Sequence, residues 1–225
     1  MHPLDNVIWQ ALTTRQTQFA EASGQARRFL PDVTALTAVE EENPRNFASL
    51  GELIGPRGTG ALFLDHPYED RDGWEYVVGA PLLQMVSEDD TPPVAANFQI
   101  AELGLQDSPE MIELTALTKP GPFGPRTHEL GTYLGIRREE KLVAMAGERL
   151  KVPGYTEVSA VCTHPDHLGH GYAQKLMSEV MRGIREGGET PFLHVRADNA
   201  RAVRVYEKLG FKTRKEGYFA VIRKL

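Results

Sequence analysis

The chain of 225 residues has a single cysteine, Cys162, and therefore no partner for an internal disulfide. No apolar run approaches the roughly 20 residues that a membrane-spanning helix needs, and residues 1–5 lack the basic-then-apolar pattern of a secretory signal peptide. These absences predict a cytoplasmic protein that has no membrane partner. The net charge of −6 also argues against a nonspecific nucleic-acid binder.

Metal-ligand spacing is also missing from this chain. His164, His167 and His170 recur at every third residue. Pro165 and the glycines that follow indicate an irregular loop, where this spacing does not place the three side chains on a common face. We therefore expect no metal site.

The composition is that of an ordinary globular protein, with 41% hydrophobic and 25% charged residues. Residues 87–93 are acidic and contain two adjacent prolines, which is typical of a linker. We therefore divide the chain near residue 90. Residues 1–90 are expected to form an N-terminal α+β lobe, and residues 91–225 a second domain.

The N-terminal lobe has a weaker pattern than the rest of the chain. Apolar residues at helical spacing predict a helix within residues 6–22, and Asn46 is a candidate N-cap for a second helix that ends at Gly55. Residues 60–64 and 74–78 are expected to be strands. The lobe is interpreted as accessory or substrate-covering; the alternative is a protein-interaction lobe that recruits a peptide substrate.

The second domain alternates strands and helices in a clearer rhythm. A helix should begin at Ser108, where Ser, Pro and Glu follow one another as at a helix start. The other expected elements are strands at 98–103, 132–137, 142–152, 156–163 and 192–196, helices at 171–186 and 199–209, and two strands within 212–225. This order predicts an α/β fold with a central mixed sheet flanked by helices.

A glycine loop between the strand at 156–163 and the next helix is the most informative segment. Gly169 and Gly171 precede the helix, where several backbone N–H groups have no internal partner and the dipole is positive. A phosphate group can approach such a backbone closely. Alone, this spacing is weak evidence and is also typical of a plain turn and helix cap, and it matches neither a dinucleotide-binding fingerprint nor a P-loop.

A second motif follows about thirty residues later. Asn199 can cap the helix at 199–209, and Tyr206 lies two turns along on nearly the same face. Gly210 stands where a helix often ends in a left-handed residue. The pair could flank an extended ligand; alternatively, Asn199 is only a cap and Tyr206 is a core aromatic residue.

Together, the two segments P-x-x-x-G-x-G-x-A and N-x-x-A-x-x-x-Y-x-x-x-G-F resemble the N-acetyltransferases of the GNAT superfamily. The likeness covers about the last 128 residues, is strongest over 156–211, and points to the branch that resembles the C-terminal half of glycine N-acyltransferases. It implies a GNAT-like fold, acetyl-CoA as co-substrate and transfer of the acetyl group to an amine in a ternary complex.

The resemblance also implies roles for individual residues. Tyr206 would protonate the departing thiolate, and Glu157 would act as a base. Backbone groups of Val161 and Thr163 would pair with the pantetheine arm of CoA. The full set of expected cofactor-binding residues is Val161, Cys162, Thr163, Leu168, Gly169, His170, Gly171, Tyr172, Ala173, Gln174 and Asn199.

This chain departs from the family pattern at two positions. Leu168 stands where Arg or Gln is usual, and His170 where another basic residue is common, so fixed positive charge near the pyrophosphate is reduced. The departure keeps a second interpretation open, in which the chain is a noncatalytic acyl-CoA-binding sensor.

A covalent mechanism through Cys162, with His164 nearby, is a further alternative. The pattern specifies neither the acceptor, nor the length of the acyl group, nor the oligomeric state.

Overall fold

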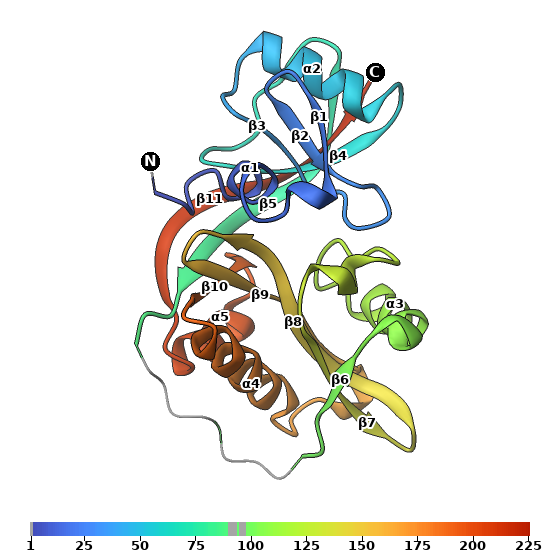
Figure 1. Ribbon diagram of the computed structural model, residues 1–225, viewed down its shortest axis with the longest axis vertical. Coiled ribbons are helices and arrows are strands. Elements are labelled where there is room, and N and C mark those ends of the chain that lie inside the picture. Colours follow the sequence, from blue (N-terminus) through green and yellow to red (C-terminus); the bar gives the residue numbers. More distant parts are fainter. Residues whose placement is uncertain (1, 90–93, 95–97) are drawn as a thin grey trace.

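The computed structural model describes residues 2–89, 94 and 98–225 (Figure 1). Its central element is a sheet of eight strands in the order β4–β11–β5–β10–β9–β8–β7–β6. Among the neighbouring strands that the structure describes in this sheet, β9 and β10 are the one parallel pair, so the sheet is mixed and the predicted fold class is confirmed. The strands are β4 (Thr59–Leu64), β5 (Trp74–Val86), β6 (Ala101–Leu103), β7 (Tyr133–Arg138), β8 (Lys141–Val152), β9 (Tyr155–Thr163), β10 (Thr190–Arg196) and β11 (Lys212–Lys224).

One face of the sheet, here called the α4 face, carries the helices α4 (Tyr172–Glu186) and α5 (Ala200–Lys208). The buried stripe of α4 packs against β7, β8, β9 and β10, which explains the apolar spacing read from the sequence. The stripe consists of Leu176, Met177, Val180, Met181 and Ile184. Complete burial of such side chains contributes about 1.5–3 kcal/mol each, so this helix is firmly anchored.

The opposite face, here called the α1 face, is covered by the N-terminal segment. Helix α1 (Val7–Thr13) and a small sheet of β1 (Ala20–Ser23), β2 (Ala26–Phe29) and β3 (Thr37–Val39) share a core with β8 and β10. Helix α2 (Pro44–Ile54) packs on the small sheet. Helix α3 (Ser108–Thr118) contacts β8 and β9, and in Figure 1 it lies across β8 from α4.

Two N-terminal predictions are wrong in detail. The helix expected within residues 6–22 ends at Thr13, and a short 3-10 turn and strand β1 follow. The N-cap of α2 is Asn43, whose side chain accepts from the Asn46 N–H at 2.9 Å, because Pro44 takes the first helical position. Asn46 is instead buried and donates to the Glu41 carbonyl.

Two strand predictions also change. The last residues were expected to form two strands, but β11 is one continuous strand that pairs with β5 along its whole length. Register shifts between Thr213 and Lys215 and between Val221 and Ile222 accommodate its bend without a turn. The strand expected at 98–103 is shorter, since β6 begins at Ala101.

The predicted linker lies partly outside the description, since residues 90–93 are not among the described residues. The main sheet takes strands from both sides of this boundary: β5 pairs with β10 and β11, and β4 pairs with β11. The predicted boundary near residue 90 therefore falls between strands of one sheet. The division of the chain into residues 1–90 and 91–225 stays a prediction. Among the described residues, no helix combines the length and apolarity needed to cross a membrane.

Candidate active site

The parallel strands β9 and β10 separate near the middle of the sheet. They pair over only three positions, residues 155–157 of β9. Beyond that point, within the described residues, β9 pairs only with β8, and β10 only with β5. The His164 N–H donates to β8, so strand alternation turns the backbone groups of Val161 and Thr163 toward the gap. An extended ligand could bind this open edge through backbone hydrogen bonds.

A bulge in β9 lies at the same place. Ala160 has φ +53°, a left-handed conformation that is unfavourable for a residue with a side chain. Across the bulge, the pairing with β8 shifts from Ser159–Gly147 to Cys162–Met145. Bulges commonly redirect strand groups beside active sites, and this one bends β9 where it leaves β10.

The start of α4 provides an anion site made of backbone groups. Gly171 is the N-cap at φ +79°, and Gly169 has φ +85°. A Cβ at either position would meet no heavy atom within 4 Å, so open space adjoins both glycines. The Lys175 N–H makes the first helical bond, to the Gly171 carbonyl. The N–H groups of residues 172–174 therefore have no helical acceptor, as a phosphate site requires.

The side chains around this cradle provide little fixed charge. Leu168 is 46% exposed, and the His170 ring stacks on Tyr172 at 5.3 Å between centroids. A cation nevertheless comes from β7, since the Arg138 Nε donates to the Tyr172 hydroxyl at 2.9 Å. Arg138 forms no ion pair within the described residues. Sequence patterns do not reveal this arginine, because it is distant from the glycine loop along the chain.

Tyr206 lies on α5 and Asn199 is the N-cap of that helix, which follows β10, the second of the two separated strands. Asn199 caps the helix as expected, accepting from the Ala202 N–H at 3.1 Å, which leaves its amide nitrogen available. Burial, with a smaller effect from nearby Cys162, raises the pKa of Tyr206 to about 12. Its hydroxyl has no hydrogen-bond partner among the described residues, so the phenol stays protonated and free to donate.

Cys162 does not have the surroundings of a nucleophile. Its thiol is buried against α3, and burial raises its pKa to about 11. His164 instead uses its Nδ1 to accept from the Asp166 N–H at 3.2 Å. The covalent alternative therefore gains no support, because a thiolate is the reactive form.

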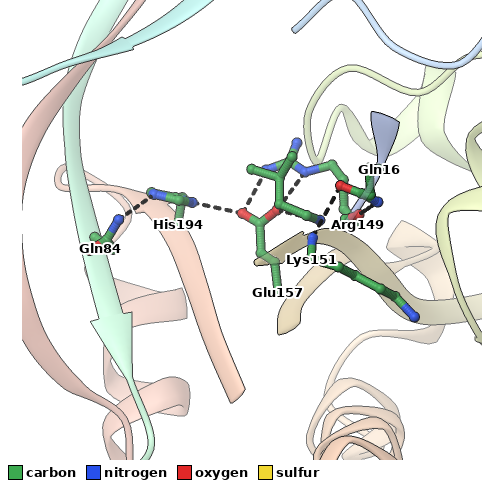
Figure 2. Close-up of polar contacts among 7 residues, drawn as sticks. Gln16, Gln84, Arg149, Lys151, Glu157 and His194 are labelled. Carbon is green, nitrogen blue, oxygen red and sulfur yellow. Dashed lines mark hydrogen bonds and ion pairs between the residues drawn. The ribbon is translucent and has the colours of Figure 1, made fainter. Parts of the chain in front are cut away.

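Glu157 lies where β9 and β10 begin to separate, with its side chain on the α1 face of the sheet. Its carboxylate is fully buried and accepts hydrogen bonds from two Arg149 nitrogens, each at 2.8 Å, and from the His194 Nδ1 at 2.7 Å (Figure 2). Burial by itself would raise the pKa of Glu157, but Arg149 and His194 outweigh it and lower the pKa to about 2. So weak a base is poorly matched to proton transfer near neutral pH, and these contacts support a positioning role.

Hydrogen bonds on both sides orient the His194 ring. Gln84 accepts from Arg214 through its oxygen and donates through its nitrogen to the Leu4 carbonyl at 2.9 Å. The same nitrogen also donates to the His194 Nε2 at 3.2 Å, and His194 donates from Nδ1 to Glu157. The ring is therefore held with Nδ1 toward the carboxylate.

Gln16 holds the backbone that carries Arg149. Its nitrogen donates to the Arg149 carbonyl at 2.7 Å, and its oxygen accepts from the Lys151 N–H at 3.1 Å (Figure 2). These bonds replace strand pairing where β8 extends beyond its ladder with β7, which ends at Gly147. Sequence analysis missed Gln16, Arg149 and His194; the only local signal was a charged pair, Glu148-Arg149, inside an apolar strand.

The histidines of the glycine loop do not form a ligand cluster. The ring centroids of His164 and His167 are 5.8 Å apart, and those of His167 and His170 are 6.5 Å apart. Across the parts of the chain that the structure describes, no group of three or more His, Cys, Asp or Glu side chains is placed to hold a metal ion.

Comparisons with known proteins agree with this geometry. The family model described as FR47-like protein matches residues 133–220. A crystal structure from Novosphingobium aromaticivorans, assigned to the GNAT family of acetyltransferases, is 36% identical, covers 100% of both chains and has a TM-score of 0.92. A GCN5-related N-acetyltransferase from Kribbella flavida shares the fold, with 18% identity, a TM-score of 0.66 and coverage of 98% of this chain and 95% of its own.

A curated relative matches a shorter stretch. Mycothiol acetyltransferase from Brachybacterium faecium is 39% identical over 111 residues, which is 47% of this chain and 34% of that protein. The match thus spans about a third of the length of this relative.

Proposed function

We propose that this chain, which belongs to the GNAT family of acetyltransferases, transfers an acetyl group from acetyl-CoA to a primary amine in a ternary complex. The proposal rests on two adjoining features: the open edge of β9, and the start of α4, where no side chain caps the backbone N–H groups. The first can bind an extended amide-containing arm, and the second can bind the pyrophosphate to which that arm is attached.

Acetyl-CoA would use backbone groups more than side chains. The N–H groups of residues 172–174 would receive the pyrophosphate, and Val161 and Thr163 would pair with the pantetheine amides. Arg138 supplies a positive charge beside Tyr172 that Leu168 and His170 do not supply. The free amide nitrogen of Asn199 is available to the CoA arm.

The chemistry requires a neutral amine, a polarised carbonyl and a proton for the leaving group. The amine nitrogen attacks the thioester carbon, a C–N bond forms, and the C–S bond breaks. The backbone N–H of Val161 would stabilise the carbonyl oxygen as it gains charge, because strand alternation turns the N–H of Cys162 toward β8 instead. Tyr206 would give its proton to the thiolate, since burial raises its pKa to about 12 and so keeps the phenol protonated. The nitrogen loses one proton as the amide forms, and this proton would restore the phenol of Tyr206.

Glu157 would act as a positioning residue. Its charge holds Arg149 and His194 in place on the α1 face, where the N-terminal segment covers the sheet. Phe63 of β4 contributes to that cover, with its ring centroid 4.4 Å from that of His194. The likeness to glycine N-acyltransferases, the cytoplasmic location and the substrate-covering role of residues 1–90 stay predictions.

The direct test measures release of the CoA thiol from acetyl-CoA in the presence of a library of primary amines. We expect thiol release that depends on both substrates, with an N-acetylated product of matching mass. CoA alone should also raise the melting temperature, because a ligand that binds only the native state stabilises it. Stabilisation by CoA without thiol release from any amine would favour the noncatalytic sensor. Failure of both would contradict the proposed site.

A further inference from the structure

Four polar side chains cross adjacent strands on the α1 face: Tyr133 on β7, Arg149 on β8, Glu157 on β9 and His194 on β10. This set is called the polar row. Gly147 pairs with both Tyr133 and Ser159, and strand alternation puts Arg149 and Glu157 on the same face as Gly147 and Ser159. The row thus lies opposite α4, beside the point where β9 and β10 separate.

Three members of the polar row satisfy one another. Arg149 binds Glu157 through two nitrogens, and His194 donates to the same carboxylate. Tyr133 differs from them: its hydroxyl is buried and has no hydrogen-bond partner among the described residues. A buried hydroxyl without a partner is destabilising, so natural proteins rarely keep one that has no role or no water or ligand beside it.

The position of the Tyr133 ring is strongly constrained. A Cβ on Gly147 would lie 2.3 Å from a carbon of this ring, so the neighbouring strand has room for the tyrosine only because it carries a glycine there. The Phe123 ring packs edge-on at 5.8 Å, and the buried cluster around Tyr133 includes Ala160 and Cys162 of the β9 bulge. The phenol is therefore held rigidly beside the strand segment that would receive the thioester.

The charges around the Tyr133 hydroxyl are compensated by ion pairs. Burial keeps the phenol protonated by raising its pKa above the usual range, Arg149 acts in the opposite direction, and Glu157 and Glu148 act with burial. Glu157 is paired with Arg149, and Glu148 with the Lys151 Nζ at 2.8 Å, so these charges compensate one another. Such surroundings suit an uncharged partner, and the oxygen of a protonated phenol can accept a hydrogen bond from the N–H of a neutral amine.

We propose that the Tyr133 hydroxyl is an acceptor-binding group that receives a hydrogen bond from the amine substrate on the α1 face. This inference rests on the proposed function and deepens it, because it names a residue that would recognise the amine. The pyrophosphate would bind at α4 on the other side, so the two substrates would meet at the gap between β9 and β10.

The test compares Tyr133→Phe with Tyr68→Phe. The Tyr68 hydroxyl is also buried and unpartnered within the described residues, but it lies in the loop between β4 and β5. Removing it therefore controls for the loss of a buried hydroxyl. The probes are tyramine, spermidine and glycinamide, assayed by thiol release from acetyl-CoA and by thermal stabilisation of the CoA-bound protein.

We expect Tyr133→Phe to raise KM for the amine by about three- to tenfold, the usual effect of one lost hydrogen bond. The KM for acetyl-CoA should stay unchanged, and the melting temperature should not fall relative to Tyr68→Phe. Without turnover in any variant, amine-dependent stabilisation of wild type that is lost in Tyr133→Phe still supports the inference, although the proposed function then fails.

Three results would overturn the inference. The first is an unchanged amine KM in Tyr133→Phe. The second is a melting temperature clearly below that of Tyr68→Phe, which would show that the hydroxyl has a partner within the protein. The third is wild type that shows neither turnover nor stabilisation with any of the three amines.

Discussion

The two faces of the sheet present different chemical groups. On the α4 face, the candidate cofactor site consists of backbone N–H groups, two left-handed glycines and exposed side chains such as Leu168. On the α1 face, three members of the polar row are buried side chains that bond to one another, since Arg149 and His194 both contact the Glu157 carboxylate. The first site depends on the path of the backbone, whereas the second depends on the identity of each side chain.

This difference predicts how each face responds to substitution. Backbone sites tolerate deletion of a side chain but are sensitive to added bulk or charge, because the ligand contacts the main chain. A buried ion pair responds in the opposite way, since removal of one partner leaves an uncompensated charge. Substitutions on the α4 face should therefore change binding or rate, and those that break the Arg149–Glu157 ion pair should also change stability.

The largest expected effect is at Tyr206, which tests the α4 face. Tyr206→Phe should lower kcat by about 10²–10⁴, the worth of a positioned acid, with little change in KM for acetyl-CoA. Steady-state kinetics measure this. The control is Tyr218→Phe on β11, which loses a hydroxyl bonded to that of Tyr76 on β5 at 3.1 Å. A kcat within threefold of wild type, with chemistry rate-limiting, would assign Tyr206 a structural role.

The next effect is on stability and concerns Glu157. Glu157→Gln should lower the free energy of unfolding at pH 7 by about 3–5 kcal/mol, because Arg149 then remains buried without its counterion. Urea denaturation measures this loss. A loss below about 1 kcal/mol would show that the ion pair exchanges with solvent despite its burial.

The pH dependence sharpens the same prediction. The folded-state pKa of Glu157 is lowered to about 2 from an ordinary value of 4.5. The ionised carboxylate therefore stabilises the fold fully above pH 4.5, and this contribution is lost as the pH falls toward 2. The stability difference between wild type and Glu157→Gln should shrink over that window, which unfolding curves at pH 7 and pH 3 would show.

A smaller effect is expected at the start of α4. Gly171→Glu should raise the Kd for CoA by about 100-fold or more and remove its thermal stabilisation, which corresponds to about 2.7 kcal/mol at matched ligand concentration. Gly154→Glu is a matched control, because Gly154 also has positive φ and open space but lies in the β8–β9 turn. A normal thermal shift in the Gly171 variant would place CoA elsewhere.

The smallest effect concerns the charge that this chain lacks. Leu168→Arg should tighten CoA binding several-fold by adding a charge-assisted contact to the pyrophosphate. The gain should be larger in the background of Arg138→Gln, which removes the neighbouring cation. Calorimetry on wild type, the two single variants and the double variant measures both effects. Equal or weaker binding by Leu168→Arg in both backgrounds would show that this position does not face the pyrophosphate.

Local signals explain how much of the fold could be predicted. Helices α4 and α5 and strand β9 lie close to their expected limits, because caps, glycines and apolar periodicity act within a few residues. The errors fall where tertiary contacts overrule local pattern. The chain leaves the helical path after α1, and there the Gln16 side chain forms a hydrogen bond with the Arg149 carbonyl of β8, 133 residues away. β11 stays one strand because β5 pairs with it throughout.

The sequence by itself determined the family motifs, the glycine loop and the positions of Asn199 and Tyr206, since each depends on neighbours within one helix or turn. Only the tertiary structure decided the strand separation, the bulge at Ala160, the place of Arg138 and the polar row. Those features join residues from different strands, and a hydrogen bond or ion pair depends on distance in space, which the order of residues along one chain does not specify.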